Sequence, residues 1–275
     1  MSTTLARAAF GFVAAAGAGM LIVRERRRRE AADRFAAAAL ETLLNAIDAN
    51  DPKTGAHVRR VAAYALALAE AAQLDDHQRL TVERVALFHD IGKIHEALFD
   101  IIHDDSRLTP AERRAIATHP LRGAQVLGPL TPFYPELAEG VLAHHERWDG
   151  TGYPRGLKGR SIPISARIVM LADTFDAVTH ARRYRNARDP SAAASVIAAG
   201  RATQFDPELV DLMLLPPVFE RIVREQQTLD SRPRLAGRDR RRGEREHHVP
   251  DVTFRWRREP VATLPPDREL RISPG

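Results

Sequence analysis

Apolar residues recur at spacings of three and four from Ala31 to about Gln226, which is the repeat of an amphipathic α-helix. No stretch of this region shows the strict alternation of apolar and polar residues that predicts a half-buried strand. Helix starts are marked by a capping side chain, often with proline directly after it. Such starts occur at Asp51-Pro52, Thr109-Pro110, Ser191 and Asp206-Pro207. We therefore predict an all-α bundle over residues 31–226.

The N-terminal segment Leu5–Val23 is apolar except for Arg7, and an arginine-rich run follows at residues 24–29. A helix of this length is just long enough to span a bilayer. Positive charge after the span predicts a single-pass inner-membrane anchor at residues 1–30, with the following domain in the cytoplasm. A cleaved signal peptide is less favoured, because its positive charge precedes the apolar run. A soluble cytoplasmic protein with a disordered or interfacial N-terminus is the other alternative.

Residues 227–275 differ from the rest in composition. From Arg232 to the end there are 12 Arg against 7 Asp plus Glu, an excess that equals the net charge of +5 of the whole chain. The segment is rich in Arg and Pro with little periodicity, which predicts a mostly disordered tail. Nucleic-acid binding is disfavoured because the arginines form no helical stripe, and association with anionic lipid is at least as compatible.

A chain of 275 residues with 44% hydrophobic content is long enough for one large core with appendages. Cysteine is absent, so disulfides and thiolate metal sites are excluded. Any metal must be held by His, Asp or Glu, which suits hard or borderline divalent ions. Iron and manganese are favoured, with zinc, nickel and cobalt as alternatives.

Several helices carry a histidine or an aspartate on their apolar face. His89 continues the face formed by Val82 and Val85, and Asp90 follows it directly. A single histidine on such a face is more often a satisfied core residue than a ligand. An acidic neighbour changes this interpretation, because a carboxylate near an apolar face needs a partner to offset its desolvation.

The same pattern recurs in two other predicted helices. Asp173 shares an apolar face with Val169, and His57 shares one with Val61 and Leu68. An unpaired buried charge is too costly to occur repeatedly by accident, whereas a bound cation would satisfy all these groups together.

Further histidines complete the set. Adjacent helical residues diverge by about 100°, so His144 and His145 can serve one site only near a helix end, and Gly150 soon follows. The candidate metal ligands are His57, His89, Asp90, His119, His144, His145 and Asp173. They exceed what one tetrahedral ion requires, so we predict two divalent metals bridged by Asp90.

The order His, His-Asp, His, His-His, Asp, together with HHERWDGTGYPRGLKG from His144 to Gly159, resembles the HD-GYP family of cyclic-di-GMP phosphodiesterases. The resemblance covers roughly residues 46–215, and FDAVT at 175–179 and TQFDPELV at 203–210 are similar to further family signatures. It implies an HD-domain helical bundle with the HD-GYP extension. It also implies a metal-dependent hydrolase that converts cyclic-di-GMP to pGpG or GMP.

The resemblance places all seven candidates on the family's metal-ligand positions. It gives Asp90 and Lys93 catalytic roles, with Lys93 contacting a phosphate oxygen or assisting the leaving group. It assigns substrate contacts to Tyr153, Arg155, Lys158, Arg182 and Arg185. A guanidinium suits a phosphodiester because its planar fork donates two hydrogen bonds. The alternatives stay open that Lys93 is a solvated cation at a helix end and that the loop cations merely solvate a surface turn.

Some positions depart from the family pattern. Lys53 stands where some members carry a glutamate that holds a third metal, which supports two metals here. The segment from His95 to Pro110 differs from the usual sequence, so its substrate contacts cannot be carried over. Ala181, Arg183 and Asn186 replace expected residues, which affects specificity more than metal binding.

Two other functions remain as alternatives to catalysis on cyclic-di-GMP. One is a non-catalytic sensor or scaffold. In it, the loop that contains Gly152-Tyr153-Pro154, the GYP motif of the family, binds cyclic-di-GMP or a diguanylate cyclase. The other is a phosphohydrolase acting on a different nucleotide, because the metal chemistry would be the same. A homodimer is a further expectation that the sequence leaves open.

Overall fold

The computed structural model describes residues 2–94, 109–180 and 187–231, with side chains described from residue 23 onward. This part of the chain is helical, and strand pairing within it is limited to an isolated bridge between Arg201 and Phe205. The predicted all-α class is therefore confirmed.

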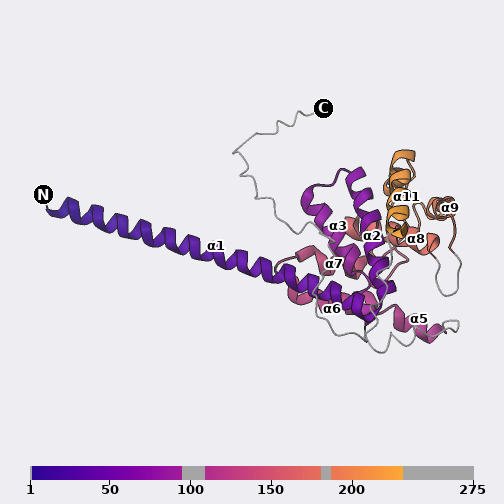
Figure 1. Ribbon diagram of the computed structural model, residues 1–275, viewed down its shortest axis with the longest axis horizontal. Helices are drawn as coiled ribbons and strands as arrows, with labels where there is room; N and C mark the ends of the chain where they lie inside the picture. The colour runs from indigo at the N-terminus through magenta and orange to yellow at the C-terminus, as the bar shows by residue number, and fades with distance from the viewer. Residues whose placement is uncertain (1, 95–108, 181–186, 232–275) are drawn as a thin grey trace, which may run out of the picture. The chain divides into compact units, whose positions relative to one another are not determined.

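The α-helices (α) and short 3-10 helices (η) are named in chain order, and Figure 1 labels most of the α-helices. The first half of the chain contains α1 (Ser2–Asn50), α2 (Pro52–Ala71), α3 (Asp76–Phe88), η1 (Ile91–Ile94), α5 (Pro110–Ile116), α6 (His119–Leu127) and η2 (Gly128–Leu130). The second half contains α7 (Pro135–Ala143), η3 (Gly159–Ser161), α8 (Ile164–Thr179), α9 (Pro190–Ala199), α10 (Pro207–Met213) and α11 (Pro216–Ser231).

Most predicted helix starts are confirmed. Asp51, Thr109 and Asp206 each accept a hydrogen bond from a backbone N–H two or three residues further on, which satisfies a donor that the first turn leaves free. The predicted start at Ser191 is wrong by two residues. Asp189 caps α9, and Ser191 lies in the first turn with its hydroxyl donating to the Asp189 carboxylate.

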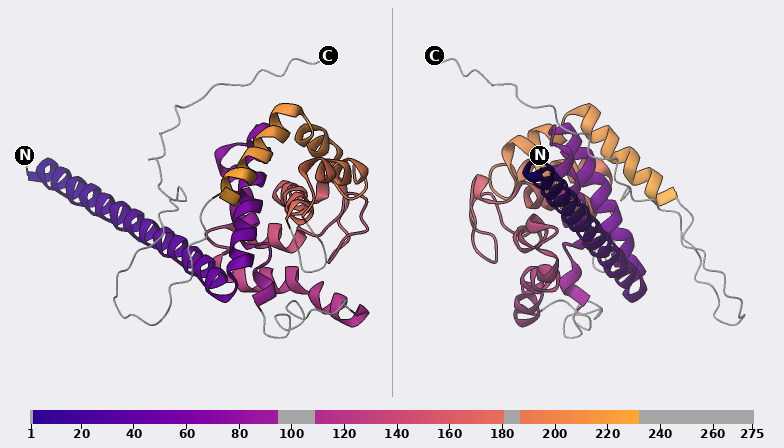
Figure 2. Two further views of the ribbon diagram at one scale, coloured as in Figure 1. Left: turned by 45° about the vertical axis from the view of Figure 1, so that its right-hand side comes forward. Right: turned by 90° about the vertical axis from the view of Figure 1, so that its left-hand side faces the viewer.

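Helix α2 lies at the centre of the described bundle. It packs against α3, α8 and α11, and Figure 2 shows α11 beside it. Tyr64 of α2 is fully buried and meets Phe175 of α8 edge to face, with ring centroids 5.1 Å apart. This packing fixes α2 and α8 relative to each other, and therefore fixes the polar side chains that both helices carry between them.

The long helix α1 joins this bundle through its last turns. Ala36, Leu40, Leu44 and Ile47 are buried at helical spacing, and α1 contacts α2. The segment Leu5–Val23, where a membrane span is predicted, lies in α1, but its side chains up to residue 22 are outside the described ones. Across the described residues, no helix is both long and apolar enough to cross a membrane.

The predicted domain limits differ from the helix boundaries. Helix α1 runs without a break across the expected limit between residues 30 and 31. Helix α11 continues to Ser231, beyond the expected end at residue 226. The remainder of the predicted tail, residues 232–275, lies outside the described residues.

Candidate metal centre

The seven candidate ligands come from five parts of the chain. His57 lies in α2 and Asp173 in α8, where the apolar neighbours of each helix hold them in place. The other five lie at helix ends, where His89 and His144 directly follow α3 and α7, and His119 is the first residue of α6. Asp90 and His145 come next in the chain, beyond the helix end, so adjacent residues can serve one site as predicted.

His57, His89 and Asp90 form one group, with their ligand atoms within 4.8 Å of one another. Nε2 of His57 lies 3.8 Å from Oδ2 of Asp90, and Nε2 of His89 lies 3.5 Å from the same oxygen. Oδ1 of Asp173 is 3.4 Å from Nε2 of His57. Two imidazole nitrogens and one carboxylate therefore lie close together, with the Asp173 carboxylate beside His57, which is a ligand set suited to a divalent cation.

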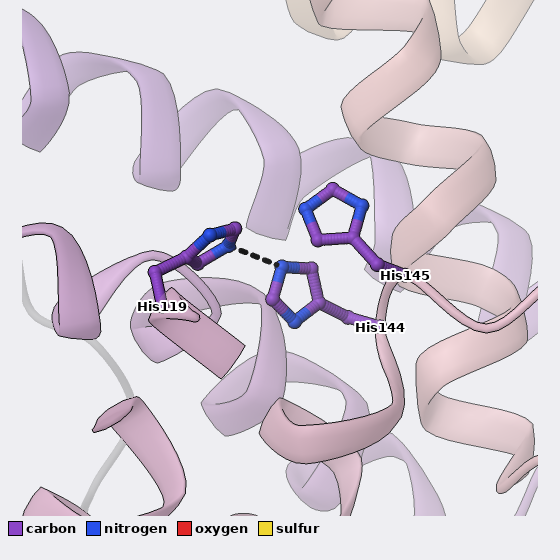
Figure 3. Close-up of side chains that lie close together, drawn as sticks. All are labelled: His119, His144 and His145. Carbon is purple, nitrogen blue, oxygen red and sulfur yellow. Dashed lines mark hydrogen bonds between the residues drawn. The ribbon is translucent and has the colours of Figure 1, made fainter. Parts of the chain in front are cut away.

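His119, His144 and His145 form the second group, again with ligand atoms within 4.8 Å (Figure 3). Nε2 of His119 lies 3.1 Å from Nε2 of His144 and 3.3 Å from Oδ1 of Asp90. Asp90 thus presents one carboxylate oxygen to each group. This is the arrangement expected of a carboxylate that bridges two sites.

Three of these histidines are oriented by the same kind of contact, between Nδ1 and a nearby backbone carbonyl. Nδ1 of His89, His119 and His144 lies 2.8, 2.7 and 2.6 Å from the backbone carbonyl oxygen three residues earlier in the chain. Those carbonyls belong to the last turns of α3, α5 and α7, where carbonyl groups lack partners within the helix. A carbonyl can only accept, so Nδ1 carries the proton in each ring, and Nε2 of the neutral His119 and His144 directs a lone pair into the cluster.

With the protons on Nδ1, the Nε2 atoms of His119 and His144 are both hydrogen-bond acceptors and face each other. A hydrogen bond between Nε2 of His119 and Nε2 of His144 requires one ring to be protonated. Burial and the Lys93 ammonium lower the pKa of His119 to about 3. Burial, then the neighbouring His145, holds the pKa of His144 well below its usual range. Nε2 of His89 is also buried without a hydrogen-bond partner. These lone pairs fit a bound cation better than they fit one another.

Lys93 lies beside the central carboxylate. Its Nζ is 2.7 Å from each oxygen of Asp90, although only the contact to Oδ2 has the geometry of a hydrogen bond and Oδ1 accepts none. Burial acts to raise the pKa of Asp90, but Lys93 and His89 outweigh it and hold that pKa well below the usual range. Asp90 is therefore ionised and available as a ligand. The expected contact of Lys93 with a phosphate oxygen stays a prediction.

Asp176, which the sequence analysis did not single out, supports His57. Its Oδ2 lies 2.7 Å from Nδ1 of His57, and the side chain is 2% exposed. Arg60 binds the same carboxylate with two nitrogens, Nε at 2.7 Å and Nη2 at 3.0 Å. Burial acts to raise the pKa of Asp176, but hydrogen bonds from His180, His57 and Arg60 hold it well below the usual range. Its position three residues after Asp173, on the same face of α8, is the signal that could have found it.

The loop that follows His145 folds back over the cluster. The ring of Tyr153 stacks on His145, with centroids 4.9 Å apart and planes 19° apart. Glu146 is buried and accepts hydrogen bonds from the backbone N–H groups of Arg155 and Leu157. A side chain at Gly152 would place its Cβ 2.3 Å from the backbone nitrogen of Arg147, so only glycine fits there. Glu146 was also absent from the predicted site, because its partners are backbone groups.

The other predicted substrate contacts stay predictions, and the structure describes two of them, Arg155 and Lys158. The guanidinium of Arg155 is paired with Glu139 of α7. Lys158 is exposed on the same loop, and Lys53 is exposed in the first turn of α2. Arg182 and Arg185 lie outside the described residues, as does most of the altered segment after Ile94.

Comparison with known families agrees with this geometry. The HD domain family matches residues 41–209, which is more than half of the chain. The chain therefore belongs to the HD domain family. Its relatives are cyclic-dinucleotide phosphodiesterases, which confirms the resemblance to the HD-GYP group within that family.

Relatives with a known activity can be compared over the same region. The 3'3'-cGAMP-specific phosphodiesterase 3 of Vibrio cholerae is 40% identical over 164 residues, covering 59% of this chain and 35% of that protein. The cyclic di-GMP phosphodiesterase response regulator RpfG of Xanthomonas campestris is 38% identical over 197 residues, covering 70% and 52%. The chain thus spans about a third to a half of the length of these relatives.

A solved structure supports the fold. The crystal structure of the V. cholerae cyclic GMP-AMP phosphodiesterase V-cGAP3 matches 71% of this chain and 53% of that chain, with a TM-score of 0.51 and 19% identity. At that identity the match supports the helical fold and not the substrate.

Proposed function

We propose that this protein is a metal-dependent phosphodiesterase that hydrolyses a cyclic dinucleotide. The proposal rests on the cluster of buried imidazole nitrogens around the ionised Asp90. Nε2 of His119 and Nε2 of His144 lie in contact, but neither carries a proton for a hydrogen bond between them. The relatives that act on cyclic di-GMP and on 3'3'-cGAMP support the substrate class.

The cluster is best suited to two divalent ions. One ion would be held by His57, His89 and Asp173, and the other by His119, His144 and His145, with Asp90 shared between them. The ligands are nitrogen and oxygen only, which suits hard or borderline divalent ions, and among these we propose iron or manganese. Lys53 at the start of α2 offers no ligand for a third ion.

Divalent ions bound here would supply an activated water molecule for in-line attack on phosphorus and would neutralise charge on the phosphodiester. The chain's own residues then orient and complete this chemistry. Asp90 lies between both groups of ligands, and we propose that Lys93, whose ammonium lies beside it, contacts a phosphate oxygen of the substrate. Burial, followed by Asp90 and Asp173, raises the pKa of Tyr153 to about 12, so its phenol remains a hydrogen-bond donor at neutral pH.

Among cyclic dinucleotides we propose cyclic-di-GMP as the substrate, with pGpG or GMP as the product. The relatives also include enzymes specific for 3'3'-cGAMP, which makes a mixed cyclic dinucleotide the main alternative. The test is side-by-side turnover of cyclic-di-GMP, 3'3'-cGAMP and cyclic-di-AMP by protein purified without oxygen, with the metal content measured on the same sample. We expect a linear dinucleotide or mononucleotide from cyclic-di-GMP and no product from Asp90→Ala.

Wild-type protein that carries two metals and stays inert on all three compounds would overturn the proposed activity. It would instead favour the sensor or scaffold function, in which the loop around Tyr153 binds a cyclic dinucleotide or a diguanylate cyclase. Binding of cyclic-di-GMP without turnover, measured by calorimetry, would support that second function.

We also propose that residues 31–226 act as the catalytic unit behind an N-terminal membrane anchor. This part rests on the apolar segment and the arginine run in the sequence. Fractionation of cells expressing the whole chain, compared with a chain starting at residue 31, tests it. We expect only the whole chain in the membrane fraction.

A further inference from the structure

Asp176 connects the candidate metal centre to a more distant part of the bundle. Its Oδ2 lies 2.7 Å from Nδ1 of His57, and its Oδ1 lies 3.1 Å from Nδ1 of His180. His180 directly follows α8, and its other ring nitrogen, Nε2, lies 3.1 Å from Oδ1 of Asp230. The chain of contacts therefore runs from His57 through Asp176 and His180 to Asp230, with about 3 Å between successive polar atoms.

The first and last contacts in this series join separate helices, and the middle contact joins Asp176 to the residue that ends α8. His57 belongs to α2, Asp176 to α8, and Asp230 to the last turn of α11. Exposure increases outward from Asp176, since the side chains of Asp176, His180 and Asp230 are 2%, 17% and 47% exposed, while that of His57 is 14% exposed. The series thus begins at the buried centre and ends at the surface, where α11 ends.

Asp176 holds the imidazole of His57 in one orientation. Of the four histidines with a described Nδ1 contact in the cluster, His57 is the one whose Nδ1 meets a carboxylate instead of a backbone carbonyl. A carboxylate on the far nitrogen fixes the tautomer of a metal-ligating histidine and makes its Nε2 a stronger ligand. Unlike a backbone carbonyl, a side-chain carboxylate stays in place only if its own partners hold it.

We propose that Asp176 is a positioning residue for the metal ligand His57, and that α11 supports it through Asp230 and His180. The last turn of α11 therefore contributes to metal affinity although it lies outside the ligand set. Arg60 fixes the plane of the Asp176 carboxylate from α2, and His180 fixes it from the end of α8. This inference rests on the proposed metal binding at His57 and adds a route by which changes at α11 alter that binding.

The test measures metal affinity, independently of turnover, by competition with a chelator of known affinity for manganese. We expect Asp176→Asn to weaken binding about tenfold or more, which is the range for loss of a carboxylate behind a ligating histidine. We expect His180→Ala to weaken it about threefold, as for one partly exposed charge-assisted hydrogen bond. His77→Ala is the matched control, since His77 is an exposed histidine of α3 that pairs with Glu136 away from the series.

A structural role alone would have a different signature. It would lower the thermal midpoint of the metal-free protein and leave metal affinity unchanged, whereas a positioning role lowers the affinity and reduces the rise in midpoint on adding metal. If Asp176→Asn does not fold, His180→Ala and Asp230→Lys carry the test. The exposed Glu220 of α11, which pairs with Arg224, provides Glu220→Lys as the control for the change in charge at Asp230.

The route through His180 is tested by a double variant. If Asp230 acts through His180, then Asp230→Lys has no further effect on metal affinity in the His180→Ala background. Independent effects of the two changes would overturn the role of α11, and unchanged affinity in Asp176→Asn would overturn the positioning role. Wild-type protein that binds no manganese or iron would overturn the proposed metal binding, and the inference with it.

Discussion

Replacing Glu146 by glutamine tests whether the loop over the metal centre is held by a buried carboxylate. Oε1 and Oε2 accept the backbone N–H groups of Arg155 and Leu157 at 2.7 and 2.9 Å, and the residue is 2% exposed. A glutamine offers one oxygen and one NH2 group, so one of the two backbone donors would face another donor. We therefore expect Glu146→Gln to lower the free energy of unfolding.

The magnitude follows from the two contacts. A hydrogen bond to a charged group contributes about 1.5–3 kcal/mol, and the N–H that then faces a donor is not satisfied by the glutamine, so we expect a loss of about 3 kcal/mol, at the upper end of that range. Leu157, which packs against Ala143, Ile162 and Ala166, would lose part of its contact as well. In a protein of this size about 3 kcal/mol corresponds to a fall of about 6–12 °C in the thermal midpoint.

The assay is urea unfolding followed by circular dichroism, with thermal unfolding as a second measurement. Glu139→Gln is the matched control, because Glu139 also binds this loop but through an exposed ion pair with the Arg155 side chain. Exposed pairs contribute about 0–1 kcal/mol, so this control should be close to wild type. Equal losses in the two variants would refute the argument that buried backbone acceptors hold the loop.

Four further results are expected. Gly152→Ala should reduce turnover at least about tenfold while metal content stays unchanged, because the added Cβ would lie 2.3 Å from a backbone nitrogen and displace the loop; kinetics and metal analysis check this. Chelation should lower the thermal midpoint, since a ligand at about 100 times its Kd stabilises by about 2.7 kcal/mol. Arg167→Ala should cost about 3 kcal/mol in urea unfolding, because it leaves the buried carboxylate of Asp206 unpaired. Metal-free protein should lose stability as pH falls from about 6.5 towards 4, because the pKa of His119 is lowered to about 3 and that of His145 to about 4, while the unfolded chain takes up protons at about 6.5; urea unfolding at several pH values measures it.

The sequence predicted the part of the site that local pattern controls. Periodicity placed His57, His89 and Asp173 on inward faces, and the structure brings them within one cluster. The pair His144-His145 required a helix end, and α7 ends at Ala143. In these cases the information lies within a few residues of each side chain, so a single chain without structure was enough.

The supporting residues could not be predicted in this way. Asp176 meets His57 across 119 positions of sequence, and Glu146 binds backbone groups that carry no residue-specific signal. The substrate contacts were predicted by resemblance alone and stay predictions, and the pairing of the Arg155 guanidinium with Glu139 of α7 could not be predicted from the motif. Long-range partners depend on how helices dock, which local periodicity does not specify.

The shared orientation of His89, His119 and His144 makes the position of each candidate metal ligand depend on where the preceding helix ends. Each Nδ1 meets a carbonyl in the last turn of a helix, so the same side chain satisfies a helix-end carbonyl and supplies a candidate ligand. Inserting one residue into the last turn of α3 or α7 would turn its histidine by about 100° away from the centre. Insertions in the connections that precede these helices would leave that relation intact. Variation in length among such proteins should therefore accumulate before α3 and α7, while their final turns keep a constant number of residues.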